Sequence, residues 1–136
     1  MINGTIIDTS VWIDYFNAII NSKTDNVVEL IKANEVLILP VILQEVLQGI
    51  RKDKLFNSII ETLVPLEFIS YHQIEMSIAA ASLYRNLKTK GVTIRKPNDC
   101  LIAAICMANN IPLLHNDKDF DNIAKHTSLK IYKTEK

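Results

Sequence analysis

The sequence has few cysteines and histidines, the residues that stabilise many small domains through disulfides or zinc sites. Only two cysteines occur, Cys100 and Cys106, and they lie in an apolar run without forming a CxxC pair. No histidine lies at a spacing that would suggest zinc binding with them. We therefore expect neither a disulfide framework nor a zinc site, and we expect both cysteines to be buried free thiols.

Export and membrane signals are also missing. The first residues, MINGTIIDTS, contain neither a basic segment nor a long apolar segment, so no signal peptide is expected. No apolar run reaches the roughly 18 residues that a membrane-spanning helix needs. An excess of one charge is absent too, because 15 Lys and Arg residues balance 15 Asp and Glu residues, which neither favours nor opposes nucleic-acid binding. We expect a soluble, cytoplasmic protein with no membrane association.

What the chain does contain is apolar residues in the patterns of buried strands and helices. Its 136 residues are 49% hydrophobic and show no repeats, low-complexity segments or linker, so residues 1–136 are predicted to form a single domain. Short apolar runs alternate with longer amphipathic segments, which predicts a parallel sheet with helices on both faces. Predicted strands cover residues 5–7, 36–39, 65–70, 111–114 and 129–132, with helices beginning near residues 10, 24, 40, 53, 72 and 99 and another before the last strand. The charged tail KTEK is expected to be frayed.

Three predicted elements begin or end at an aspartate. Asp8 follows the first strand, Asp99 opens a helix, and Asp117 follows the IPLL strand. In an open α/β sheet such positions converge on one edge, and clustered carboxylates raise one another's pKa values unless a cation is present. Oxygen ligands select a hard ion such as Mg²⁺ or Mn²⁺, which suits phosphoryl-group chemistry. An alternative stays open for Asp8, because Asp is also a common helix N-cap.

Glu45 has a different prediction from its position on a helix. The helix after Pro40 has an apolar stripe made of Leu43, Val46, Leu47 and Ile50. Glu45 falls opposite this stripe, so periodicity alone predicts a solvated surface acid. Gly49 in the same helix costs about 1 kcal/mol relative to Ala, which indicates close approach by another group.

A basic segment without any acid precedes Asp99. Between Glu75 and Asp99 lie a third of the chain's basic residues, namely Arg85, Lys88, Lys90, Arg95 and Lys96. One explanation is a solvated helix end, since Lys and Arg suit helix C-termini. The other is a phosphate-facing rim around an acidic site. The sequence leaves both explanations open.

Three motifs in this order resemble the signature of a known family. The stretches IIDTSVWIDYF, LQEVLQGI and PNDCLIAAICMANNIPLLHNDKDFDNIA are similar to PIN-domain ribonucleases, and most similar to the VapC-like toxins of type II toxin–antitoxin modules. The resemblance covers Ile6 to Tyr132, and the DCLIAA helix followed by a strand and NDKDF is its most specific part. It implies a three-layer α/β/α fold around a central, mainly parallel sheet of four to five strands.

The resemblance also assigns roles to individual residues. It implies catalytic and metal-binding roles for Asp8, Glu45, Asp99 and Asp117, an accessory metal-binding role for Asp119, and a supporting role for Ser10 beside the first aspartate. His115 is a departure, because many members carry Thr or Ser there; it is assigned a structural or water-positioning role. Arg85, Lys88 and Arg95 are candidates to hold RNA phosphates.

As such toxins do, the chain is expected to be a homodimeric, Mg²⁺- or Mn²⁺-dependent endoribonuclease that a small VapB-like antitoxin neutralises. An RNA-processing PIN nuclease without a toxin role is an alternative, and a PIN domain that only binds as a scaffold is another. A receiver-type signalling module is a further alternative. It is disfavoured because residues 53–70 offer no strand that ends in the Asp needed as a phosphoacceptor.

Overall fold

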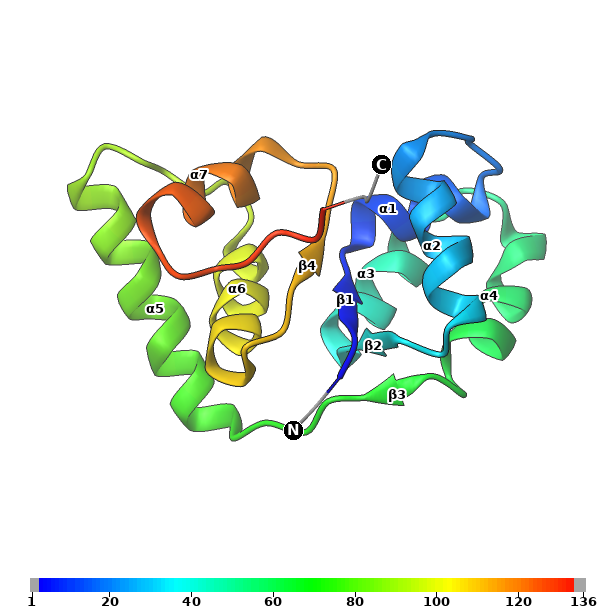
Figure 1. The fold of residues 1–136 in the computed structure, drawn as a ribbon, viewed down its shortest axis with the longest axis horizontal. Helices are drawn as coiled ribbons and strands as arrows, with labels where there is room; N and C mark the ends of the chain where they lie inside the picture. Colours follow the sequence, from blue (N-terminus) through cyan, green and yellow to red (C-terminus); the bar gives the residue numbers. More distant parts are fainter. Residues whose placement is uncertain (1–2, 134–136) are drawn as a thin grey trace.

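A four-stranded parallel sheet forms the centre of the protein. The computed structural model describes residues 3–133. The strands follow the order β3-β2-β1-β4 across the sheet and comprise β1 (Thr5–Ile7), β2 (Val36–Ile38), β3 (Glu67–Phe68) and β4 (Leu113–Leu114) (Figure 1). The predicted parallel α/β architecture is confirmed. The predicted fifth strand at residues 129–132 is reduced to a single bridge between Leu113 and Ile131.

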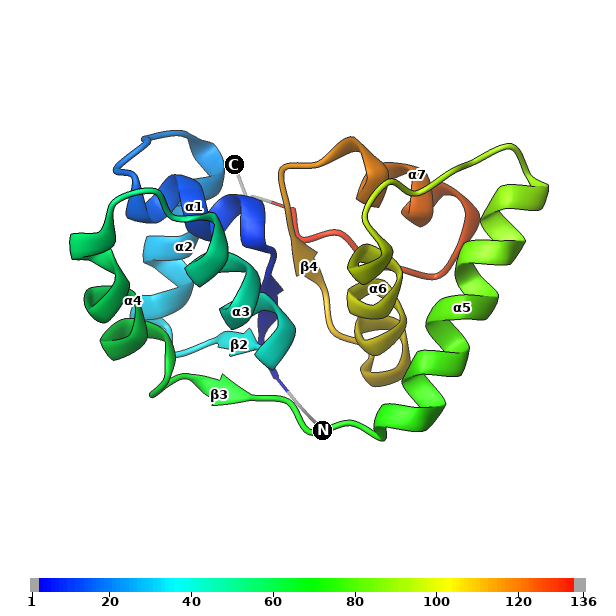
Figure 2. The ribbon, with the colours of Figure 1, turned by 180° about the vertical axis from the view of Figure 1, so that it is seen from behind.

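Helices flank the sheet on both sides. They are α1 (Thr9–Phe16), α2 (Ser22–Lys32), α3 (Pro40–Gly49), α4 (Phe56–Leu63, after the 3₁₀ turn η1, Asp53–Leu55), α5 (Gln73–Thr89), α6 (Pro97–Asn109) and α7 (Lys118–His126). Helices α1 to α4 gather on one side of the sheet and α5 to α7 on the other, as Figures 1 and 2 both show. No helix within residues 3–133 is long and apolar enough to span a membrane. The expected frayed tail lies outside the described residues, apart from Lys133.

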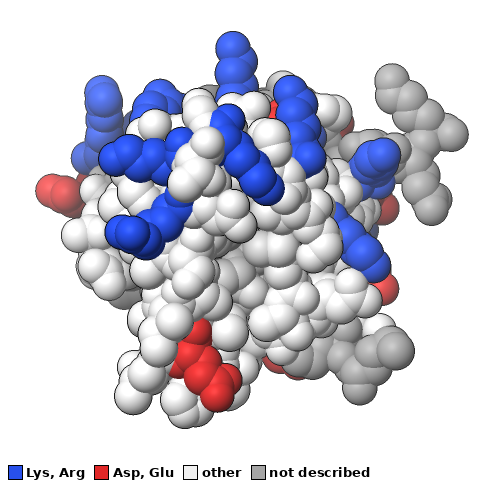
Figure 3. All heavy atoms as spheres, turned by 90° about the vertical axis from the view of Figure 1, so that its left-hand side faces the viewer, with Lys and Arg blue, Asp and Glu red and all other residues white. Residues whose placement is uncertain are grey.

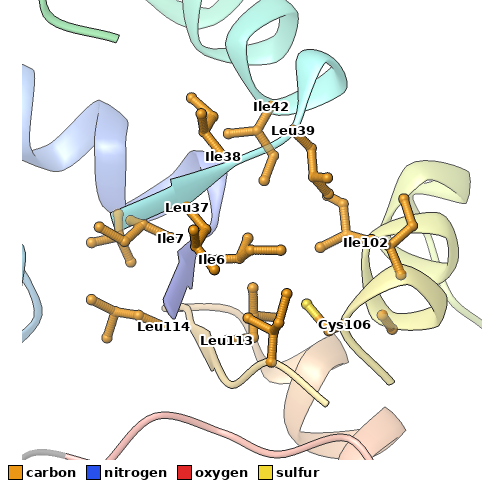
Figure 4. Packing of buried hydrophobic residues seen from close by; sticks show 14 of the residues in the cluster. Ile6, Ile7, Leu37, Ile38, Leu39, Ile42, Ile102, Cys106, Leu113 and Leu114 are labelled. Atoms are coloured by element: carbon orange, nitrogen blue, oxygen red, sulfur yellow. The ribbon is translucent and has the colours of Figure 1, made fainter. Parts of the chain in front are cut away.

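The core is built around β1, β2 and β4, which are buried on both faces, as their unbroken apolar runs predict. In Figure 4, Ile6 and Leu113 point toward Ile102 of α6, whereas Ile7 and Leu114 point the opposite way. All of these side chains are fully buried. Burial on both faces fixes the ends of β1 and β4 firmly, and the site residues follow directly after those ends.

Both cysteines are free and buried, as predicted. Burial raises the pKa of Cys100 to about 11 and that of Cys106 to about 12, so both are protonated packing residues near neutral pH. Phe56, which opens α4 after the 3₁₀ turn η1, is 45% exposed, whereas Ile59 and Leu63 of the same helix are fully buried.

Gly49 ends α3 and provides the close approach that the sequence suggested. A Cβ atom at this position would lie 2.7 Å from Cδ1 of Ile13, so the glycine lets α1 pack closely against α3. This packing matters for the site, because α1 and α3 each contribute residues to it.

Candidate active site at the carboxyl edge of the sheet

The carboxyl ends of β1 and β4 and the first turn of α6 all face the upper side of the molecule in Figures 1 and 2. Asp8 directly follows β1 and caps α1, where its Oδ2 accepts bonds from the hydroxyl of Ser10 at 3.0 Å and from the Ser10 amide at 3.4 Å. Its side chain is buried and lines a cleft. The two alternatives for Asp8 therefore hold together: it is an N-cap and a cleft residue. Burial raises its pKa, and Ser10 opposes that shift.

Glu45 faces the same cleft. It is half-buried, its Oε1 accepts a 2.6 Å hydrogen bond from the hydroxyl of Thr9, and its Oε2 accepts a 3.2 Å bond from the amide of Asn98. The prediction of a solvated surface acid is wrong. The helical wheel counted only the apolar stripe of α3, whereas the opposite side of that helix faces the first turns of α1 and α6.

Asp99 lies in the first turn of α6 and is only 3% exposed. Its Oδ2 is buried and has no hydrogen-bond partner among the described residues. Burial raises the pKa of Asp99 to about 7, and the charges of Asp8, Asp117 and Glu45 act in the same direction, while Lys96 opposes them. A buried carboxylate oxygen without a donor is costly unless a cation lies beside it.

These residues surround a cleft of about 280 Å³. Its lining consists of Asp8, Thr9, Glu45, Gln48, Gly49, Lys96 and Asp99. Three of the lining side chains are carboxylates, contributed by three separate elements.

A second group of acids lies on the other side of Asp99. Oxygen atoms of Asp99, Asp117 and Asp119 all lie within 4.8 Å of one another. Asp117 caps α7, where its Oδ1 accepts a 2.9 Å bond from the Asp119 amide. Asp119 is buried. Asp99 is thus the residue shared by the cleft and by this three-acid group.

Two cations of the preceding loop contact the three-acid group. Arg95 Nε lies 3.4 Å from Oδ2 of Asp119 and its Nη2 lies 3.6 Å from Oδ1 of Asp117, while Lys96 Nζ lies 3.5 Å from Oδ2 of Asp117. Burial works to raise the pKa of Asp117, but the Asp119 amide, Lys96 and Arg95 outweigh it and hold that pKa below its ordinary value. Both cations are largely exposed, so these ion pairs are weak and exchangeable.

His115 is buried behind Asp117. Its Nδ1 accepts a 3.0 Å hydrogen bond from the Asp117 amide, which fixes the backbone where β4 gives way to α7. Its Nε2 lies 3.2 Å from Oδ1 of Asp121, an ion-pair distance, although the pair does not meet hydrogen-bond geometry. Burial lowers the pKa of His115, against the nearby charge of Asp121. A neutral ring that accepts at Nδ1 fits a positioning role for His115.

Arg85 and Lys88 lie apart from the acids. Both are exposed on the second half of α5 and line a separate cavity of about 400 Å³. Figure 3 shows Lys and Arg side chains gathered on the upper part of the molecular face that α5 helps to form. The structure therefore places Arg95 against the acids and leaves Arg85 and Lys88 on a basic surface beside them.

Sequence reasoning did not identify two further residues at the site, Thr9 and Asn98, which hold the two oxygens of Glu45. Lys96 was named only as part of the basic segment, and the structure places it in the lining of the cleft. The available signal for Thr9 and Asn98 was adjacency, since each lies next to Asp8 or Asp99 in the chain. Their roles depend on contacts between distant segments, which spacing along one helix does not show.

The donor set fits a divalent cation. All candidate ligands are carboxylate oxygens, which suit a hard ion, and the unpartnered Oδ2 of Asp99 lies where the two groups of acids meet. Asp99, Asp117 and Asp119 are close enough to share one ion, while Asp8 and Glu45 line the cleft together with Asp99.

The fold and the acid cluster define a member of a known class. The family model described as the PIN domain matches residues 5–126, so the chain belongs to the PIN domain family. Among proteins of known name, it is 32% identical over 127 residues to the VapC ribonuclease Mb1587 of Mycobacterium bovis and to ribonuclease VapC11 of Mycobacterium tuberculosis. Each alignment covers 92% of this chain and 95% of the relative.

The fold is also found in a solved structure. The crystal structure of VapBC2 from Rickettsia felis, bound to a DNA fragment from its promoter, contains a similar chain with a TM-score of 0.73 and 22% sequence identity. The match covers 94% of this chain and 96% of the other. At that identity the likeness concerns the fold.

Proposed function

We propose that this PIN domain is a Mg²⁺- or Mn²⁺-dependent endoribonuclease that acts as the toxin of a toxin–antitoxin pair. The observation that carries the proposal is the buried, unpartnered carboxylate of Asp99 between two groups of acids. The relatives that share 32% identity over 92% of the chain are named VapC ribonucleases, which supports RNA as the substrate.

The acids divide into two roles in this proposal. Asp99, Asp117 and Asp119 hold the ion, with Asp8 approaching from the cleft. When bound, Mg²⁺ or Mn²⁺ would acidify water and neutralise charge on the phosphate oxygens. Glu45, held at both oxygens by Thr9 and Asn98, is positioned to accept a proton from the attacking water. Attack in line on the phosphorus then forms one P–O bond while the bond to the leaving oxygen breaks.

The basic surface supports the RNA substrate in this proposal, and the family resemblance supports the partner. Arg85 and Lys88 supply a basic surface for flanking RNA phosphates, and Arg95 is held beside the acids. In the VapC-like toxins that the chain resembles, a small VapB-like antitoxin neutralises the enzyme. We include this partner, a homodimeric state and a cytoplasmic location in the proposal.

The direct test is cleavage of RNA by purified protein with Mg²⁺, with Mn²⁺ and with chelator. Wild-type protein should cleave only with the ion, and Asp99→Asn should lower the rate by a factor of about 100 or more. Asp53→Asn, which neutralises an exposed acid outside the site, is the matched control and should keep full activity. Folded wild-type protein that cleaves no RNA under any condition would instead support the non-catalytic scaffold alternative.

An RNA-processing nuclease is the second candidate, and expression in cells separates it from a toxin. A toxin should arrest growth, Asp99→Asn should abolish the arrest, and co-expression of the cognate small protein should relieve it. Harmless expression of a protein that cleaves RNA in vitro would favour the processing role.

A further inference from the structure

A second cavity lies directly beside the acids, between α5 and α6. It measures about 450 Å³ and has a largely apolar wall that includes Ala81 and Tyr84 of α5 and Pro97 and Cys100 of α6. Among residues 3–133, the charged residues that line it are Arg85 and Arg95. The cavity therefore combines an aromatic ring and small apolar side chains with two guanidinium groups and no carboxylate.

The first turn of α6 separates this cavity from the acid cleft. Lys96 and Asp99 line the cleft, whereas Pro97 and Cys100 line the cavity. Arg95 links the cavity to the three-acid group, because it lines the cavity and its guanidinium contacts Asp117 and Asp119. A molecule that extended from the cavity to these acids would pass over Arg95.

This combination of groups fits one kind of occupant. We propose that the cavity is a base-binding subsite that takes one unstacked nucleobase of the RNA, next to the phosphate that is cleaved. The base lies against Tyr84, since aromatic rings stack on nucleobases, and Arg85 and Arg95 face the phosphates on its two sides. The inference rests on the proposed ribonuclease function and extends it, because a base can enter the cavity only from an unpaired stretch of RNA.

The charge around the cavity favours RNA over an apolar side chain of a protein partner. Lys and Arg side chains gather on the part of the surface to which the C-terminal half of α5 contributes (Figure 3). The stretch from Met76 to Asn98 contains no acidic residue at all. An apolar peptide would offer no anion to Arg85 or to Arg95, whose ion pairs with Asp117 and Asp119 are weak, whereas an RNA strand supplies an anion on each side of every base.

The test measures how binding depends on a single base. The probe is a short fluorescein-labelled RNA with one cleavage site mapped for the wild-type enzyme, together with versions that carry one abasic nucleotide at successive positions. Binding is measured with the Asp99→Asn protein so that the probes stay intact. Removal of one base next to the cleavage site should weaken binding about 10-fold, and removal of more distant bases should have little effect.

Variants assign that dependence to the cavity. In a Tyr84→Ala background the sensitive position should lose its effect, and in a Tyr84→Phe background it should keep its effect, because phenylalanine retains the ring. Ala81→Phe fills the cavity with a ring from an exposed helical position, so the sensitive position should lose its effect in this background too. This variant tests the cavity independently if Tyr84→Ala folds poorly. Tyr71→Ala is the matched control, since Tyr71 lines a different cavity near β3.

Three outcomes would overturn the inference while leaving the nuclease intact. One is a flat abasic scan, and another is the same single-base effect in the Tyr84→Ala and Ala81→Phe backgrounds. The third is that the Tyr84→Ala and Ala81→Phe variants lose binding to a protein partner while their RNA binding stays unchanged. That result would assign the cavity to a peptide. Failure of the proposed function looks different, because the wild-type enzyme would then produce no cleavage site to map.

Discussion

Thr9 donates a 2.6 Å hydrogen bond to Glu45 and so ties the first residue of α1 to the middle of α3. Asn98 holds the second oxygen of the same carboxylate from the first turn of α6. Glu45 of α3 thus connects to α1 and α6, which are both distant from it in the sequence. Its orientation toward the cleft depends on these two donors, since the apolar stripe of α3 lies on the other side of that helix.

Loss of the Thr9 hydroxyl should therefore impair turnover more than substrate binding. Thr9→Val keeps the shape of the side chain and removes a bond to a charged group, which is worth about 1.5–3 kcal/mol. We expect kcat to fall about 10-fold or more with little change in KM. Steady-state cleavage kinetics measure both quantities. Thr62→Val, which removes an exposed hydroxyl on α4, serves as the control, and an equal loss in both variants would argue against a positioning role.

Asp99→Asn should stabilise the protein when no divalent cation is present. The carboxylate is buried beside other acids, so its neutralisation relieves repulsion and desolvation worth about 1–3 kcal/mol at pH 8. Thermal unfolding in chelator should show a higher Tm for the variant than for wild type. Added Mn²⁺ should raise the Tm of wild type and have little effect on the variant. A variant that is less stable in chelator would show that Asp99 has a stabilising partner.

The pH dependence of stability should carry the signature of the raised carboxyl pKa values. Burial raises the pKa of Asp99 from 3.8 to about 7 and also raises that of Asp8, so the folded state binds protons that the unfolded state has released. In chelator, Asp99 makes stability fall as the pH rises from about 4 to 7, and the raised pKa of Asp8 acts in the same direction above its ordinary value. His115 acts in the opposite direction below pH 6.5, because burial lowers its pKa.

The comparison of wild type with Asp99→Asn isolates one group from the others. The difference in unfolding free energy between the two proteins should grow as the pH rises through the range from 4 to 7 and should then level off. Chemical denaturation at several pH values measures it. A difference that stays constant with pH would mean that the pKa of Asp99 is not raised.

Two histidine rings provide a matched pair for a stability prediction. His115 and His72 each accept a backbone N–H with Nδ1, from Asp117 and Glu75 respectively, but His115 is buried and His72 is exposed. His115→Ala leaves a cavity and a buried amide without its acceptor, so a loss of about 1–3 kcal/mol is expected. His72→Ala should cost less, because water can replace the ring. Equal losses in urea unfolding would contradict the positioning role of His115.

Sequence patterns predicted the features of this protein that depend on residues close to one another along the chain. Strands buried on both faces are unbroken apolar runs, so the sheet could be predicted, and with it the approach of Asp8, Asp99 and Asp117 to one edge. Glu45 could not be placed by periodicity, because its partners Thr9 and Asn98 come from other helices. Its inclusion depended on the family resemblance.

The contacts of Arg95 illustrate the same limit. The sequence left open whether Arg95 belongs to a phosphate-facing rim, and it does not show which acids the side chain contacts once the loop between α5 and α6 has folded. The structure places its guanidinium against Asp117 and Asp119. Arg85, on α5, lines one cavity together with Arg95.

The central claim is that the acids from four separate parts of the chain form one divalent-cation site that cleaves RNA. The most direct test is calorimetric titration of Mn²⁺ into wild type and Asp99→Asn, with RNA cleavage assayed on the same samples. We predict that wild type binds the ion and cleaves, and that the folded variant does neither. Binding and cleavage by Asp99→Asn at wild-type levels would contradict the claim.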